Sequence, residues 1–100
     1  MSTLFTFHSS WHDTAWLYEQ LGFAASGDAI VLLEDAVLAL QSPITLASFL
    51  AKTEAQEVQV FALVEDMLVR GIESKFSEVK QIGYDGFVDL MTRHDKQVAW

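Results

Sequence analysis

Five short runs of apolar and β-branched residues recur along the chain and predict β-strands over residues 3–7, 29–33, 58–64, 78–82 and 97–100. The second and third runs are apolar throughout, without the alternation of a strand that has one solvent-exposed face. Continuous hydrophobicity of this kind is typical of strands that are covered on both faces of a parallel sheet.

Helical spacing fills the intervals between these runs, and we predict helices over residues 10–22, 35–40, 42–52, 65–70 and 85–94. Ser10 and Ser42 suit the N-cap position of two of these helices, and Asp85 is expected to cap the last one. Gly71 directly follows Arg70, the last residue of another predicted helix, and we expect Gly71 to form the C-terminal cap of that helix.

Strands and helices alternate along the whole chain, which predicts an α/β fold. We expect a three-layer parallel sheet of about five strands with helices on both faces, as in Rossmann and flavodoxin-like folds. The sequence shows no repeat, low-complexity tract or linker, so we expect a single domain over residues 1–100. The pattern does not determine the order of the strands.

The composition agrees with a folded domain and narrows the function, since 51% of the residues are hydrophobic and 20% are charged. The formal net charge is -8, and no lysine or arginine precedes Lys52. Because proteins bind nucleic acids largely through Lys and Arg on phosphates, no direct contact with nucleic acid is expected. The chain does not begin like a signal peptide, and its apolar runs are too short to span a bilayer. We therefore expect a cytoplasmic protein without membrane association.

The sequence contains no cysteine. A disulfide, a thiolate metal site and a thiol nucleophile within these residues are therefore excluded. Any covalent sulfur chemistry in which this chain takes part must be carried by a cysteine of another protein.

The polar residues at the expected carboxyl ends of the strands do not form a recognisable catalytic motif. The turn after the first run contains no glycine, so it lacks the phosphate-binding loop of nucleotide sites. Asp66 could imitate the acceptor of a phosphoaspartate receiver, but Phe7 and His8 replace the acids that such a site needs. Ser9 and His94 could belong to a hydrolytic triad only if the fold joined them, and Ser9 lies in no nucleophile elbow.

Two sets of side chains could hold a metal: His8 with His12, or Asp35 with Glu65 and Asp66. The alternative for the acids is that they lie at helix N-termini, where carboxylates stabilise the helix dipole, and we favour this alternative. His94 is expected at the C-terminal end of the last helix for the same electrostatic reason. We therefore expect no catalytic residue, no metal and no cofactor.

Four segments, in chain order, resemble the DsrH/TusB family. Residues 82–100 (IGYDGFVDLMTRHDKQVAW) are similar to its closing pattern I-x-Y-x-x-F-V-x-L-T-x-K-H, which ends in A-W or S-W. Residues 60–71 (VFALVEDMLVRG) resemble V-Y-A-L-x-E-D-L-x-A-R-G, and residues 27–37 (GDAIVLLEDAV) resemble a G-D-x-L-L-L segment that ends in G-V. Residues 4–9 are similar to an L-H-x-S start. Ala36 departs from the family, which usually has glycine there, so we expect a local change of backbone.

The resemblance implies a DsrEFH-like fold and a non-catalytic subunit of a TusBCD-like sulfur-transfer complex, with TusC-like and TusD-like partners (DsrF-like and DsrE-like in sulfur oxidisers). In such complexes a TusA-like carrier delivers a persulfide to the TusD-like subunit. A TusE-like protein then passes the sulfur on for 2-thiolation of the tRNA wobble uridine. The alternative is a DsrH-like subunit of a DsrEFH complex in dissimilatory sulfur oxidation. Some relatives in sulfur oxidisers carry a cysteine in this subunit, so its absence favours tRNA thiolation. The sequence does not determine whether the isolated chain forms a homo-oligomer.

Six residues within the matching motifs are candidates for the subunit interface: Asp66, Arg70, Tyr84, Phe87, His94 and Trp100. The alternative for these residues is maintenance of the fold, with Asp66 at a helix start and Phe87 in the core. Trp11 and Trp16 are expected in the core, whereas a tryptophan at the C-terminus needs a contact that holds it in place.

Replacing Trp100 with alanine should weaken assembly with the TusC-like partner, because tryptophan is among the side chains that contribute most to interfaces. Gel filtration of the two co-expressed chains measures the effect. Unchanged co-elution of the Trp100→Ala chain would contradict the prediction.

Overall fold

The computed structural model of the chain describes residues 2–8, 21–22, 24–41, 43–74 and 76–99. Its centre is a five-stranded sheet in the order β4-β3-β2-β1-β5, and every neighbouring pair of strands is parallel. The strands are β1 (Thr3–Phe7), β2 (Ala29–Leu32), β3 (Gln59–Leu63), β4 (Val79–Ile82) and β5 (Lys96–Ala99). The predicted parallel sheet and its five strands are confirmed, with strand ends that differ from the prediction by at most one residue.

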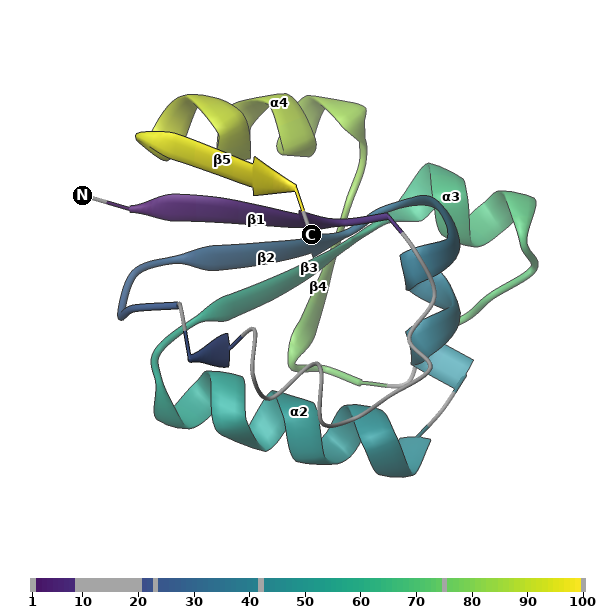
Figure 1. Ribbon diagram of the computed structural model, residues 1–100. Coiled ribbons are helices and arrows are strands. Elements are labelled where there is room, and N and C mark those ends of the chain that lie inside the picture. Colours follow the sequence, from purple (N-terminus) through teal and green to yellow (C-terminus); the bar gives the residue numbers. More distant parts are fainter. Residues whose placement is uncertain (1, 9–20, 23, 42, 75, 100) are drawn as a thin grey trace.

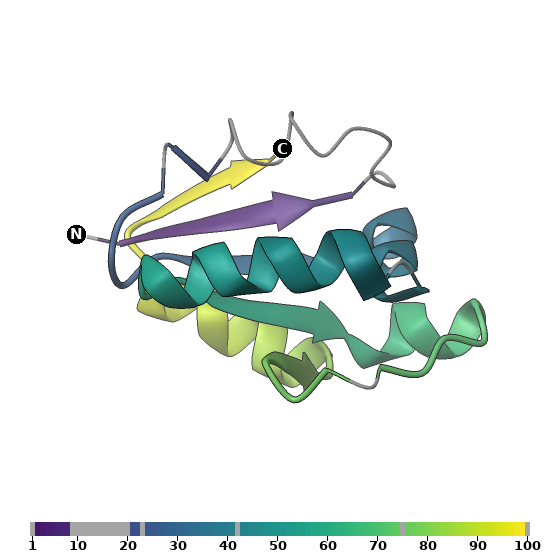
Figure 2. The ribbon, with the colours of Figure 1, turned by 90° about the horizontal axis from the view of Figure 1, so that it is seen from below.

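Helices cover both faces of the sheet, as predicted. α2 (Pro43–Ala55) lies on one face and α4 (Tyr84–Arg93) on the other (Figure 1). Seen from below, α2 lies in front of the sheet and runs along the strands, and α4 lies behind the sheet (Figure 2). The 3-10 helix η1 (Glu34–Gln41) follows β2, and the short α3 (Val64–Val69) follows β3. The helix predicted over residues 10–22 falls almost wholly outside the described residues.

Side chains that alternate along the strands fill two separate cores. On the α2 face, the ring of Phe7 in β1 packs near Phe49, with 6.4 Å between the ring centroids. On the α4 face, Leu4 and Val31 join a second cluster with Leu90 of α4. Successive residues of a strand point to opposite faces. Because a core lies on each face of the sheet, both sets of alternating side chains of β2 are buried. This explains the uninterrupted apolar sequence of β2.

Among the described residues, no single helix is long and apolar enough to cross a membrane. The segments Glu34–Gln41 and Leu46–Ala55 have sufficient length and apolar composition only as a pair, and the chain bends by 105° between them. Both segments bury apolar side chains in the core, such as Val37 and Phe49.

The prediction that Asp85 caps the last helix is wrong. Gly83 occupies the N-cap position of α4 in an extended conformation, and Asp85 lies inside the first turn. The amide N–H of Tyr84 donates to Oε2 of Glu65, at an N–O distance of 3.4 Å. A carboxylate from α3 therefore accepts a hydrogen bond from one amide of the first turn of α4, a tertiary contact that local spacing does not reveal.

The helical turn that follows β2 is confirmed, but as a 3-10 helix that begins one residue earlier than predicted, at Glu34. Ala36 is fully buried within it. The left-handed backbone of this turn falls on Glu34, with φ of 49°, and not on Ala36. Alanine at position 36 is therefore accommodated without the strain that a positive φ would cause.

Two helices end in the same hydrogen-bonded turn with different residues in its left-handed position. After α3, Gly71 has φ of 63°, its N–H donates to Leu68 O, and Ile72 N–H donates to Met67 O. This is a Schellman motif, and the predicted glycine end at Gly71 is confirmed. After α2, the equivalent position with φ of 59° is occupied by Glu57.

The turn at Glu57 makes the same pair of hydrogen bonds, Glu57 N–H to Glu54 O and Val58 N–H to Thr53 O. These bonds explain why the prediction that the helix ends near Lys52 is wrong. α2 continues to Ala55 and stops where Val58 turns back into the core, with 5% of its surface exposed.

Glu57→Gly should stabilise the chain by about 0.5–1 kcal/mol. Glycine removes the cost of holding a side chain in a left-handed backbone, and part of this gain is lost because glycine makes the unfolded chain more flexible. Urea unfolding of the purified chain measures the change. Glu57→Gln is the control for loss of the negative charge near a helix C-terminus, and should give a smaller gain. A Glu57→Gly chain less stable than the wild type would show that the turn is not strained.

Candidate partner-binding edge of the sheet

The carboxyl ends of the parallel strands lie together at one edge of the sheet, on the right in Figure 1. η1 and α3 start at this edge, and α4 starts there directly after β4. The first turns of η1 and α3 contain the acidic residues Glu34, Asp35, Glu65 and Asp66. The prediction that Asp35, Glu65 and Asp66 lie at helix starts is confirmed.

Arg70 joins η1 to α3 at this edge. Its Nε and Nη2 atoms donate to the Oδ1 atom of Asp35 at 3.1 and 3.0 Å. Its Nη1 atom donates to the backbone oxygen of Asp66 at 3.2 Å and lies 3.8 Å from the Asp66 carboxylate. One guanidinium group therefore holds two acidic residues of different helices, and only 24% of its side chain is exposed.

Asp66 makes a second connection between the same two helices. Its Oδ2 atom accepts a hydrogen bond from the backbone N–H of Glu34 at 2.7 Å, which is short for an N–H···O bond. Glu34 is the residue with the left-handed backbone. The Asp66 carboxylate therefore holds the strained turn that leads from β2 into η1, in addition to lying at the start of α3.

Glu65 connects α3 to α4. Besides the bond from the Tyr84 amide, its carboxylate packs against Gly83, where an added Cβ atom would lie 3.2 Å from Oε2. A side chain at position 83 would crowd this contact, which gives the glycine a packing reason. Tyr84 itself remains 57% exposed beside this junction.

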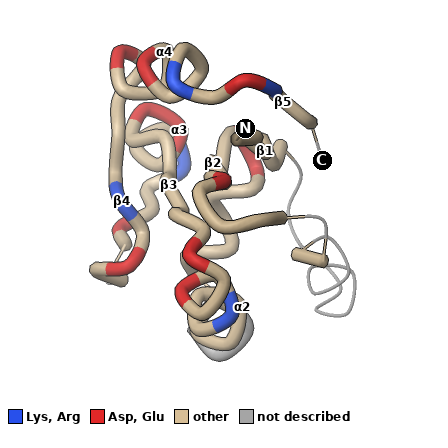
Figure 3. The backbone as a smooth tube through the Cα atoms, turned by 90° about the vertical axis from the view of Figure 1, so that its left-hand side faces the viewer, with Lys and Arg blue, Asp and Glu red and all other residues tan. Residues whose placement is uncertain are grey.

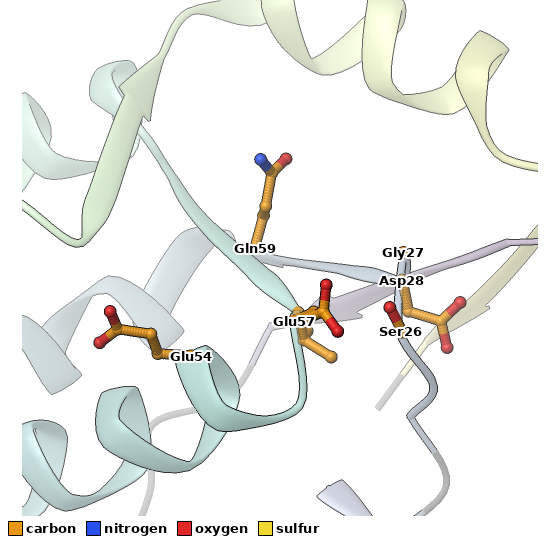
Figure 4. Close-up of a pocket in the computed structure, with 7 residues that line it drawn as sticks. Ser26, Gly27, Asp28, Glu54, Glu57 and Gln59 are labelled. Carbon is orange, nitrogen blue, oxygen red and sulfur yellow. The ribbon is translucent and has the colours of Figure 1, made fainter.

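A pocket at the opposite, amino edge of the sheet is also lined by acids, including Asp28, Glu54 and Glu57 (Figure 4). Asp28 is only 5% exposed, and both of its carboxylate oxygens are engaged. Oδ1 accepts from the amide of Thr3 and Oδ2 from the amide of Ala25, each at 2.8 Å. Asp28 therefore ties the start of β1 to the turn before β2, and its role here is structural.

No group of three or more His, Asp or Glu side chains among the described residues is arranged to hold a metal. Asp35 and Asp66 are instead neutralised by Arg70, and Glu65 faces the start of α4. The other candidates, His12 and Ser9, lie outside the described residues.

Comparison with known proteins assigns the family. The family model described as DsrH like protein matches residues 8–97 of the chain. The chain belongs to this DsrH-like family.

Curated relatives match the DsrH-like chain over most of its length. Protein TusB of Enterobacter sp. (strain 638) is 34% identical over 95 residues, which cover 93% of this chain and 94% of that protein. Protein TusB of Yersinia enterocolitica is 35% identical over 94 residues, with the same two coverages. Protein TusB of Buchnera aphidicola is 38% identical over 74 residues, or 73% of this chain and 74% of that protein.

A solved structure with the same fold is the crystal structure of the ychN protein from E. coli. It superposes on the DsrH-like chain with a TM-score of 0.66 and covers 99% of this chain and 97% of that protein. The two sequences are only 14% identical, so this likeness concerns the fold alone.

The structure brings together only part of the six residues predicted for a subunit interface. Asp66, Arg70 and Tyr84 lie at the carboxyl edge, within the network of η1, α3 and α4. Phe87 is partly buried and packs against the core cluster on the α4 face, which agrees with the alternative role in the fold. Trp100 lies outside the described residues.

His94 lies at the far end of α4, just before β5, and thus at the amino edge of the sheet. Its position at the C-terminal end of the helix is confirmed. The Nδ1 atom is 2.7 Å from Leu90 O, and because a carbonyl oxygen only accepts, Nδ1 carries the proton. Tyr84 and His94 therefore lie at opposite ends of α4, and His94 is not part of the carboxyl edge.

Asp66→Ala should lower the free energy of unfolding by about 1–2 kcal/mol, because it removes the acceptor of the Glu34 amide and one partner of Arg70. Asp35→Ala should cost less than about 1 kcal/mol, since this carboxylate is 63% exposed and its ion pair is screened by water. Urea unfolding of both variants makes the comparison. An Asp35→Ala chain as destabilised as Asp66→Ala would contradict this ranking.

Proposed function

We propose that the chain is a single-domain, non-catalytic subunit of a TusBCD-like complex that serves 2-thiolation of the tRNA wobble uridine in the cytoplasm. The observation that carries the proposal is the similarity, over nearly the full length, to proteins named Protein TusB. The absence of cysteine supports the non-catalytic part, because a persulfide needs a thiol to carry it.

In such a complex the subunits have different roles, because only those with a cysteine can carry the sulfur. A TusA-like carrier hands a persulfide to a cysteine of the TusD-like subunit, and a TusE-like protein takes it onward to the thiolating enzyme. The present chain would hold the TusC-like and TusD-like subunits in their arrangement without touching the sulfur. The carboxyl edge supports such a role, since Arg70, Asp66 and Glu65 connect three helices into a frame.

The second candidate is a DsrH-like subunit of a DsrEFH complex in dissimilatory sulfur oxidation, which the description of the matching family favours. The names of the curated relatives favour tRNA thiolation. Genes for a dissimilatory sulfite reductase beside the coding gene would support the second candidate.

Deletion of the gene should reduce the 2-thiouridine content of bulk tRNA to a small fraction of the wild-type level, because the sulfur-carrying subunit loses a companion. Mass spectrometry of nuclease-digested tRNA measures the modified nucleoside, and expression of the wild-type chain from a plasmid should restore it. Normal 2-thiouridine in the deletion strain would exclude this function.

A further inference from the structure

Large apolar side chains are exposed on α3 and α4. Leu68 is 73% exposed, Val69 is 82% exposed, and Val88 is 52% exposed; with Tyr84 at 57% they form what we name the α3–α4 patch. Among the described residues, the remaining large apolar side chain of this kind is Val98 of β5, at 37%. Exposed apolar surface gathered in one region is a mark of protein interaction sites.

The α3 and α4 parts of the patch are connected through Glu65. Leu68 and Val69 follow Glu65 by three and four residues, so they share its face of α3. The Glu65 carboxylate binds the amide of Tyr84, and Val88 lies one helical turn after Tyr84. The start of α4 lies near α3 in Figures 1 and 2.

A groove continues the patch toward the end of β4. Leu68 lines it together with Ile72, Glu73 and Gln81. The fold does not need the exposed side chains, because α3 is anchored by buried Met67 and α4 by buried Leu90. Their apolar character is therefore available for a contact outside the chain.

The charges around the patch indicate which kind of partner surface would complement it. Residues 64–73 and 84–93 together carry five carboxylates and two arginines. Arg70 is paired with Asp35, and Arg93 is paired with Asp89 at 2.8 Å. Figure 3 shows acidic residues on α3 and along α4. A partner surface that complements this region is apolar at its centre and rich in Lys or Arg around it.

The same charges argue against a second copy of the chain as the occupant. A symmetric dimer through this face would place its excess carboxylates opposite one another, and each chain has a formal net charge of -8. Nucleic acids and anionic lipid surfaces would be repelled for the same reason.

We propose that the α3–α4 patch is the docking surface for a companion subunit of the complex, and that the companion contributes an apolar segment flanked by basic residues. The identity of the companion as a TusC-like or TusD-like chain rests on the proposed function. The inference adds which surface is used and what chemistry the companion presents there.

The test is co-expression of the chain with the TusC-like and TusD-like subunits of the same organism, followed by affinity measurement on the purified chains. Leu68→Asp and Val69→Asp should each weaken binding by about tenfold or more, because each places a charge in an apolar contact. Both side chains are largely exposed, so the fold should survive, and circular dichroism checks this. Ala51→Asp, on the exposed side of α2, is the matched control and should bind like the wild type.

Raising the salt concentration should weaken binding of the wild-type chain, as expected of complementary charges. If the wild type binds and both α3 variants bind equally well, the docking surface is wrong while the proposed function stands. If the wild type binds neither subunit, both proposals fall. A wild-type homodimer that Leu68→Asp dissociates would identify a second copy as the occupant and overturn the proposed companion.

Discussion

All five strands run in one direction, so the chain leaves β2, β3 and β4 at the same edge of the sheet. The described helices that begin there, η1, α3 and α4, each carry an acidic residue in the first turn, and the parallel arrangement gathers these carboxylates. Their repulsion is offset by Arg70, which binds Asp35 and Asp66, and by backbone amides that donate to Asp66 and Glu65. The rest of this edge depends on that compensation, because it fixes η1, α3 and α4 relative to one another.

The same charge balance bears on function. The carboxylates that Arg70 and the amides neutralise are used within the fold and are not arranged as metal ligands. What the region offers to other molecules is apolar area on α3 and α4 within an acidic surrounding. This apolar area, on a chain of the DsrH-like family, is the basis of the proposal that the chain acts by binding other proteins.

The central strands β2 and β3 were predictable because they are covered on both faces, and burial on both faces leaves an unbroken apolar run in the sequence. The end of α3 was predictable because glycine is the residue that adopts a left-handed turn without strain, and Gly71 stands there. The end of α2 was not, because Glu57 adopts the same backbone and gives no such signal. The motifs named six interface candidates but did not place them in space; the fold puts Asp66, Arg70 and Tyr84 at the carboxyl edge and His94 at the other end of α4.

The sequence by itself determined the class of fold, the two-sided burial of β2 and β3, the resemblance to the family, and the absence of cysteine. These properties depend on the local pattern and the composition of the chain, which do not require contacts between distant residues. Only the tertiary structure decided the strand order, the cap of α4 by Glu65, the hold of Asp66 on Glu34, and the meeting of α3 with α4. These are contacts between residues 19 and 32 positions apart in the chain or between separate elements, and they exist only once the parallel crossovers have brought them together.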